Sequence, residues 1–217
     1  MATTLASLRD RVELQLNDAS NIVWSTTELD EAITQALDAY SLHLPRKAIA
    51  TITLAAAGRE ISLASLTFTS IEHVWWDYDS SDPDYPPKFR TFNVWPGPLL
   101  YITDVEEPAA GDVVRIWYTA PHTLNGLLSA TATTVPPAHD TLIAQGAAAF
   151  AVLQHRVYIA QAVNDNEWAP RNLREWAETR LADFYRQLDV LARQAAAIAA
   201  GIASGPALDR WDGSNTW

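Results

Sequence analysis

The chain has 217 residues, a formal net charge of −11 and no cysteine. A chain of this length folds as one large domain or as a small domain with an insertion, and the missing cysteines exclude disulfides and thiolate metal sites. Because neutralising phosphates requires an excess of Lys and Arg, the acidic balance argues against an open nucleic-acid-binding patch, although DNA can slide past a negative wall without sticking. The first residues carry no basic region followed by a long apolar run, so we expect neither a signal peptide nor a membrane span.

Two helices are expected in residues 1–46. Apolar residues recur every three or four positions along the first helix, at Leu5, Leu8, Val12 and Leu16. Residues 17–21 are polar and indicate a break. Ser25-Thr26-Thr27-Glu28 has the pattern of a capping box and predicts the start of the second helix, which Pro45 ends. The apolar face of this helix consists of Leu29, Ile33, Ala36, Leu37 and Tyr40.

The periodicity changes between residues 47 and 120. Ile49–Leu54 alternates apolar and polar residues with a period of two, as a half-buried strand does. Turn signals such as Pro96-Gly97-Pro98 separate further short strands. We expect those strands at 61–63, 70–76, 90–94, 99–103 and 113–119. Five or six short strands of this kind predict a small antiparallel sandwich or barrel.

The remainder of the chain is again helical. After a loop rich in Thr, Ala and Pro, one helix is expected from Asp140 to about Ala162 and a long one from about Asn172 to Ala200. The sequence therefore predicts an α+β fold. Residues 1–46 and 121–200 contribute two N-terminal and two C-terminal helices to a bundle, residues 47–120 form an inserted β-rich domain, and residues 201–217 form an extended, flexible tail.

No motif for catalysis or for cofactor binding is recognisable. The chain has no phosphate-binding loop, no G-x-S-x-G elbow and no H-E-x-x-H pattern among its five histidines. The acidic run Asp77–Asp84 fails the calcium-loop template, because the sixth and twelfth positions hold Asp82 and Lys88 in place of Gly and Glu. We expect a protein that is not an enzyme, with no catalytic residues, no cofactor and no metal site.

The β-rich part carries much of the negative charge, since Gly58–Ala120 contains ten acidic and four basic residues. For the loop Asp77–Asp84 three interpretations remain open: a solvated turn, a loose cation site, or part of an acidic surface. The residues of that acidic surface are Asp77, Asp79, Asp82, Asp84, Glu106 and Glu107.

Tryptophans lie in or beside the expected strands at Trp75, Trp76, Trp95 and Trp117. Aromatic residues in alternating strands more often fill a core than bind a ligand. Because neighbouring residues face opposite sides of a strand, Trp75 and Trp76 cannot both point into one core. Exposed Trp side chains on a β-sandwich could instead stack on sugar rings, which makes a carbohydrate-binding module the alternative function.

The last residues, Gly205–Trp217, combine Gly, Ser and Asn with two tryptophans. A flexible segment with aromatic anchors is suited to folding onto a partner. We therefore predict a partner-binding tail, with Leu208, Arg210, Trp211 and Trp217 as its contact residues. A tail that packs on its own domain, or that stays disordered, is the other interpretation.

The helical ends carry a recognisable pattern, which consists of Trp24–Ile33 with Ala36–Tyr40, of Leu142–Phe150, and of a long final helix that ends in a tail. In this pattern the chain resembles tailed-bacteriophage head-to-tail connector (adaptor) proteins. The resemblance covers about 120 residues, and the large β insertion departs from the smallest adaptors of long-tailed phages. It implies a structural virion protein, assembled in the host cytoplasm, that forms a ring of typically about twelve copies under the portal vertex.

The partners that this resemblance implies are the portal protein, neighbouring copies of the chain, and a stopper or tail protein. The tail would dock on the portal, and the acidic surface would line the DNA channel or face the next ring. Genomic DNA would pass through the lumen without specific binding, and no membrane is involved. The alternative remains a carbohydrate-binding β-module of a phage tail or cell-surface protein.

Overall fold

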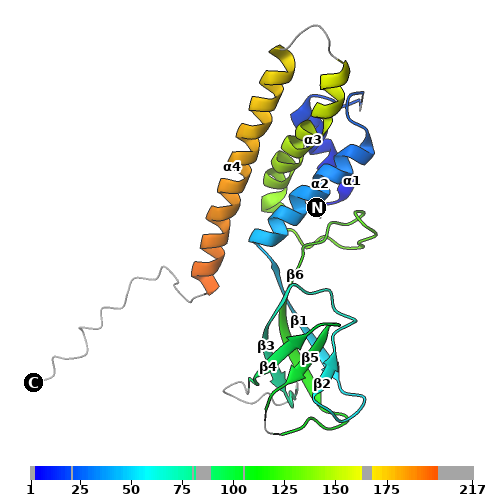
Figure 1. The fold of residues 1–217 in the computed structure, drawn as a ribbon, viewed down its shortest axis with the longest axis vertical. Helices are drawn as coiled ribbons and strands as arrows, with labels where there is room; N and C mark the ends of the chain where they lie inside the picture. The colour runs from blue at the N-terminus through cyan, green and yellow to red at the C-terminus, as the bar shows by residue number, and fades with distance from the viewer. Residues whose placement is uncertain are drawn as a thin grey trace, which may run out of the picture.

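A computed structural model describes residues 3–20, 22–79, 81, 89–104, 106–162 and 168–199. Over this part of the chain the fold is α+β, with four α-helices and two small antiparallel sheets of three strands each. The elements in chain order are α1 (Leu5–Leu16), α2 (Thr26–His43), β1 (Arg46–Thr53), β2 (Glu60–Ser62), β3 (Ser70–Trp76), β4 (Phe92–Trp95), β5 (Leu99–Ile102), β6 (Val113–Ala120), a 3₁₀ turn (Pro137–His139), α3 (Asp140–Ala162) and α4 (Trp168–Ala199). The helices lie at one end of an elongated molecule and the strands at the other (Figure 1).

Capping boxes start the first two helices. In α2 the Ser25 hydroxyl accepts the backbone N–H of Glu28, and the Glu28 carboxylate accepts the N–H of Ser25, as the sequence predicted. A second box, which was not predicted, starts α1. The Thr4 hydroxyl accepts the backbone N–H of Ser7, and the Ser7 hydroxyl accepts the N–H of Thr4. Each box satisfies backbone donors that the first turn of a helix leaves without a partner.

A buried carboxylate organises the turn from α1 to α2. Asn17 ends α1 in the left-handed conformation (φ 54°), and Asp18 follows with a side chain only 7% exposed. The Asp18 carboxylate accepts the backbone N–H groups of Trp24, Ile22 and Val23. These bonds, that from Trp24 foremost, hold the pKa of the Asp18 carboxyl below its usual value. The turn brings Trp24 into the helical core.

Helix α3 packs against the other three helices. The face it buries consists largely of small residues, namely Ala144, Ala147, Ala148 and Ala151. Small side chains let helix axes approach closely, and Gly146 meets the ring of Phe184 from α4. The α4 face contributes Ala177, Phe184 and Leu188 to the same core. Helix α4 begins at Trp168, four residues before the predicted start. Pro170 falls in its first turn, where proline is tolerated, and so does not stop the helix.

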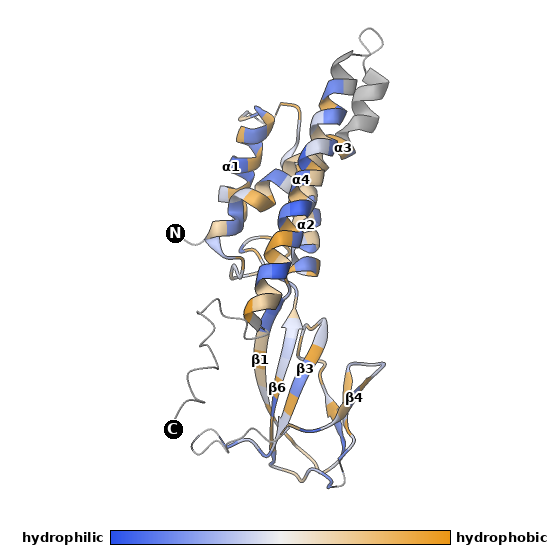
Figure 2. Cartoon of the chain, turned by 90° about the vertical axis from the view of Figure 1, so that its left-hand side faces the viewer, coloured by the Kyte–Doolittle hydropathy of each residue, from blue (hydrophilic) through white to orange (hydrophobic). Residues whose placement is uncertain are grey.

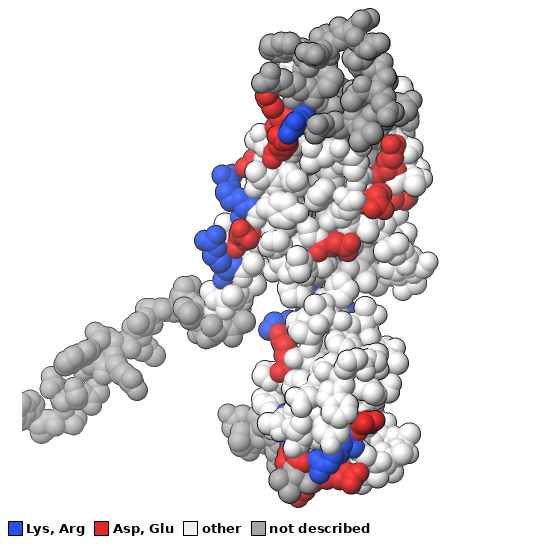
Figure 3. Space-filling model, in the orientation of Figure 1, with Lys and Arg blue, Asp and Glu red and all other residues white. Residues whose placement is uncertain are grey.

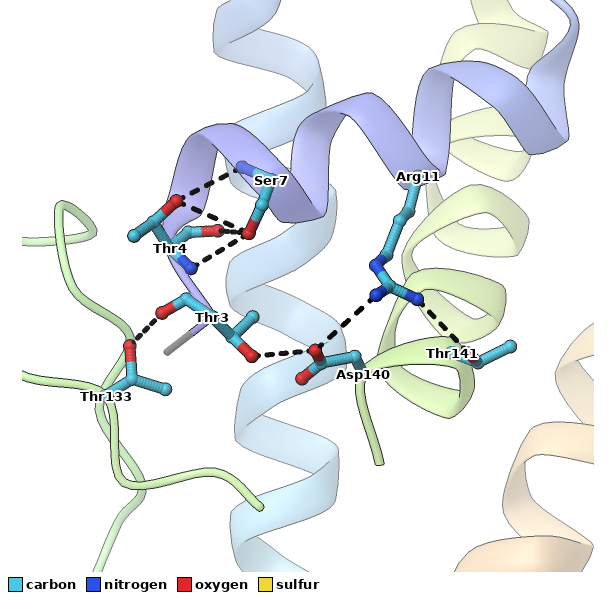
Figure 4. Close-up of polar contacts among 7 residues, drawn as sticks. All are labelled: Thr3, Thr4, Ser7, Arg11, Thr133, Asp140 and Thr141. Atoms are coloured by element: carbon cyan, nitrogen blue, oxygen red, sulfur yellow. Dashed lines mark hydrogen bonds and ion pairs between the residues drawn. The ribbon is translucent and has the colours of Figure 1, made fainter. Parts of the chain in front are cut away.

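Polar contacts attach the loop 121–139 to the start of the chain (Figure 4). The hydroxyl of Thr133 donates to the carbonyl oxygen of Thr3, and the hydroxyl of Thr3 donates to the Asp140 carboxylate at 2.7 Å. Arg11 lies 3.9 Å from the same carboxylate. Asp140 is the first residue of α3, where a negative charge suits the helix dipole, so its side chain joins Thr3 and α1 to α3.

The strands form two separate sheets with the orders β1-β6-β3 and β2-β5-β4. Every pairing is antiparallel, and β3 has a bulge between Ile71 and His73. Apolar side chains from both sheets share one core, distinct from the helical core, with Leu54, Ile61, Leu63, Val74, Trp76, Leu100, Ile102, Val114, Ile116, Tyr118 and Ala120 as its buried members. The strands lie where alternation and turn signals predicted them, within a few residues.

The expectation of a barrel was wrong. Strands β1 and β3 are the edges of the first sheet, and β2 and β4 are the edges of the second. β2 has three residues and β4 has four, which is too short to pair along the eight-residue β1 and so to close the sheets on each other. Figure 2 shows β1, β6 and β3 side by side, with β1 running directly out of the helical part.

Candidate functional site

The described residues contain no group of three or more His, Asp or Glu side chains placed to hold a metal ion. Among the helices in the same part of the chain, none is long and apolar enough to cross a bilayer. The side chains with functional potential instead lie in a polar cluster at the junction, on the two sheets, and on exposed apolar positions of the helical part.

Tyr40 lies between two histidines where the helical part meets the β part. Its hydroxyl lies 2.6 Å from Nδ1 of His139, and its ring makes an edge contact with His122 at a centroid distance of 5.1 Å. His122 is held by the hydroxyl of Ser41, which accepts its backbone N–H, and by the carbonyl of Thr134. Burial raises the pKa of Tyr40 to about 12 and lowers the pKa of His122. Burial therefore favours the neutral forms of Tyr40 and His122, and the cluster joins α2 to the loop 121–139.

The outer face of the first sheet carries an aromatic cluster, defined by Trp75, Tyr78, Phe89, Trp117 and Arg115. Trp75 stacks on Trp117 at 6.3 Å between centroids, and the guanidinium of Arg115 lies 4.4 Å from the Tyr78 ring. Trp76 points the other way, into the β core, and its indole N–H donates to Asp112. The prediction that one of the two adjacent tryptophans leaves the core is confirmed, yet Trp75 is only 6% exposed because the cluster itself covers it.

The second sheet presents a more open aromatic pair. Trp95 stacks on Tyr101 with centroids 4.5 Å apart and an angle of 9° between the rings, and Trp95 remains 42% exposed. Asn93 and Glu60 flank Tyr101 in the same row across the three strands. The exposed Trp95 ring thus lies on the sheet surface against Tyr101, and Tyr101 has an amide and a carboxylate as its neighbours on the adjoining strands.

Large apolar side chains are exposed at several places on the helical part, including Leu42 of α2 (79% exposed) and Leu128 in the loop 121–139 (83%). One group lies on α1 and the loop that follows it: Leu14 (78% exposed), Ile22 (83%) and Val23 (45%). Another lies on α4: Tyr185 (38%), Val190 (45%) and Ile198 (78%). Figure 1 shows α1 and α4 on opposite sides of α3. We call these groups the α1 flank and the α4 flank; periodicity alone did not identify them, because it reveals buried faces and not exposed ones.

A shallow depression of about 480 Å³ lies between the first turns of α2 and the loop 126–128. Its lining includes Glu28, Asp30 and Glu31, but Glu28 caps α2 and Asp30 forms an ion pair with Arg9 at 2.5 Å. These two carboxylates are already used to hold the fold.

The described residues of the predicted acidic surface lie in two different loops. Asp77 and Asp79 follow β3, and Asp79 accepts hydrogen bonds from Ser81. Glu106 and Glu107 are exposed in the loop between β5 and β6, whereas Asp82 and Asp84 lie outside the described residues. Acidic and basic side chains are interspersed at the far end of the β part (Figure 3), and Arg90 there binds Asp104 at 2.7 Å.

The predicted partner-binding tail, with Leu208, Arg210, Trp211 and Trp217, lies outside the described residues. The helix before it is described up to Ala199. Trp176 of that helix packs partly buried against the helical core, with Arg180 over its ring at 5.6 Å.

No protein-family model matches the chain. A search of curated proteins finds no similar sequence.

Proposed function

We propose that the chain is a structural virion protein, a head-to-tail adaptor that forms a ring beneath the portal vertex of a tailed phage. The observation that supports this proposal best is that both α1 with its following loop and α4 carry exposed large apolar side chains, the α1 flank and the α4 flank. A cyclic ring needs two different, complementary surfaces on each copy, because every copy contacts its neighbours head to tail. Exposed apolar side chains at both surfaces would become buried in the ring.

In this proposal the four helices act as one rigid bundle, with α3 at its centre. The tail from residue 201 docks on the portal through Leu208, Arg210, Trp211 and Trp217. Each tail adds a modest contact, and the ring multiplies it. The β part extends away from the portal, where its acidic residues line the DNA channel or face a stopper or tail protein.

Electron microscopy of the chain mixed with the portal protein of the same phage tests the proposal. We expect a ring beneath the portal, and a portal without added density would overturn it. Leu14→Glu and Ile198→Glu should each block ring formation, because each places a charge in one flank. A mixture of the two variants should give dimers through the two intact flanks but no rings, and Val94→Glu in the β part is the matched control.

A separate experiment tests the tail. Deleting Gly205–Trp217 should leave the melting temperature unchanged and abolish portal capture in a pull-down. Trp211→Ala and Trp217→Ala should weaken assembly more than Trp176→Ala, relative to their effects on melting, because Trp176 packs on the core. Undiminished capture by the deletion variant would contradict the role of the tail.

One observation favours a second candidate, a carbohydrate-binding module. The exposed Trp95 ring is stacked on Tyr101, which Asn93 and Glu60 flank, and this surface has the composition of one that stacks on a sugar ring. Titration with bacterial surface glycans should then change tryptophan fluorescence in the native chain and not in Trp95→Ala. Portal binding without any glycan response would exclude this second candidate.

A further inference from the structure

Three of the four sheet edges carry features that prevent pairing with another chain. β2 and β4 are only three and four residues long. β3 is bulged between Ile71 and His73, and residues Phe89 and Arg90 cover its far half through a bridge to Trp75 and a bond to Val74. Short length, bulges and covering segments are the devices by which natural sheets avoid edge-to-edge association.

Over the described residues the edge of β1 is neither short, bulged nor covered, and its charged residues, Arg46 and Lys47, stand at one end of the strand. β1 has eight residues in unbroken register with β6, and no proline interrupts it. Leu54, just beyond it, exchanges backbone hydrogen bonds with Asp112 and Gly111. Because antiparallel ladders alternate, the even-numbered residues of β1 face β6, and Lys47, Ile49, Thr51 and Thr53 point their N–H and C=O groups at the free edge. Within the described part of the chain, β6 is the strand that pairs with β1.

The β core is also open at this edge. Ala48, Ala50 and Ile52 point toward the core but are only partly buried, and Ile49 on the opposite face is 51% exposed. An added strand would cover both faces, and its inward side chains would extend the core. The chemistry of the edge therefore fits an extended segment with alternating small apolar residues.

We propose that β1 pairs antiparallel with β1 of a second copy of this chain, about a two-fold axis at Ala50. In this register Ala48 lies beside Ile52 of the second copy, so a small residue faces a large one, and Ile49 lies beside Thr51. All four outward residues are then paired, giving roughly eight backbone hydrogen bonds. A shift by two residues toward the start of β1 would place Pro45, which has no N–H, opposite Thr53.

Charge favours the antiparallel arrangement. Arg46 and Lys47 lie at the start of β1, and Lys47 is 65% exposed. The loop that carries the exposed Glu106 and Glu107 lies at the other end, where the N–H of Gly58 donates to Pro108. Lys47 itself is paired with Glu72 of its own chain at 3.1 Å. Parallel pairing would still set the two basic strand starts side by side, which antiparallel pairing avoids. Antiparallel pairing also places the two helical parts at opposite ends, since β1 runs out of the helical part (Figure 2).

This inference goes beyond the proposed function and does not depend on it. Two edge strands bury less surface than the roughly 1,200 Å² typical of the smallest stable interfaces, so the dimer is weak and concentration-dependent. Both flanks of the helical part remain free in it.

Cysteine cross-linking in the full chain tests the register, because the native chain has no cysteine. Across the two-fold axis Ala50 forms a non-hydrogen-bonded pair with itself, with Cα atoms about 4.5 Å apart, which a disulfide can span. Thr53 lies about 20 Å from its counterpart. Under mild oxidation Ala50→Cys should give a covalent dimer and the more exposed Thr53→Cys should not. Equal cross-linking of both variants, or none from Ala50→Cys, would overturn the proposal.

Sedimentation velocity over a concentration series tests the edge itself. Thr51→Pro removes an N–H that points at the free edge and leaves every β1–β6 hydrogen bond in place, so it should abolish the dimer while circular dichroism stays native. Thr51→Ala keeps that N–H and should dimerise normally. A native chain that stays monomeric at every concentration refutes the inference.

Discussion

Phe184 of α4 lies against Gly146 of α3 so closely that a β-carbon on the glycine would stand 2.8 Å from the ring. Phe184 is fully buried, with partly buried Phe150 in edge contact at 6.4 Å. The ring therefore has little room to move. This contact sets how near the two longest helices approach each other.

Gly146→Ala should destabilise the protein. In an isolated helix the substitution would stabilise by about 1 kcal/mol. Here the steric conflict dominates, and overpacking costs of about 1–3 kcal/mol are typical. Thermal unfolding should show a lower melting temperature. Phe184→Leu alone opens a cavity, but combined with Gly146→Ala it should cost less than the sum of the two changes. A higher melting temperature for Gly146→Ala would disprove the close contact.

Asp18→Asn should lower stability most at neutral pH. The pKa of Asp18 is below its usual value in the fold, so its stabilisation is complete above about pH 4, the unfolded pKa, and is lost as pH falls through the folded pKa. The gap in melting temperature between the native chain and the variant should therefore narrow below pH 4. Asp10→Asn on exposed α1 surface is the control at neutral pH. A gap that widens toward acid pH would contradict the hydrogen-bonded turn.

Local signals predicted the elements well because local physics determines them. Ser25, Glu28 and Pro45 bound α2 through a capping box and a missing N–H, and both act within a few residues. The alternation of β1 and β6 likewise reveals which side chains face a core. The start of α4 was predicted too late. Its third residue is Pro170, and from the sequence alone a proline inside the first turn of a helix looks like one that precedes the helix.

The same local signals could not predict which strands pair across long stretches of sequence. Whether β1 pairs with β6 or with β2 depends on contacts between residues 60 or more positions apart. The sequence therefore could not distinguish a sandwich from a barrel, and the barrel was wrong. The burial of Trp75 follows from Trp117 and Phe89, which come from other strands and loops. The free edge of β1 and the two flanks are properties of the assembled surface, which periodicity does not report.

Tyr40→Phe should cost less stability at alkaline pH than at neutral pH. At pH 7 it removes the hydrogen bond to His139 and should cost about 1 kcal/mol of unfolding free energy. The pKa of Tyr40 is raised to about 12, so the native chain keeps its full stability below pH 10 and loses it as pH rises toward 12. Urea titrations at pH 7 and pH 11 should therefore show the deficit of the variant shrinking. An unchanged deficit at pH 11 would exclude Tyr40 as the alkaline-sensitive group.

His122→Asn should reduce the loss of stability on mild acidification. Burial lowers the pKa of His122, with Arg46 and His139 adding repulsion, so the folded state binds a proton less readily than the unfolded chain does. The stabilisation is complete above the unfolded pKa of about 6.5 and is lost as pH falls through the lower folded pKa. The native melting temperature should therefore drop from pH 7 to pH 5, and the variant, whose amide can still donate to Thr134, should show a flatter profile. Ser41→Ala removes the acceptor of the His122 backbone N–H without removing a titrating group. It should therefore lower the melting temperature at every pH and leave its pH dependence unchanged. If the His122→Asn variant lost melting temperature on acidification as steeply as the native chain does, a group other than His122 would be responsible for that loss.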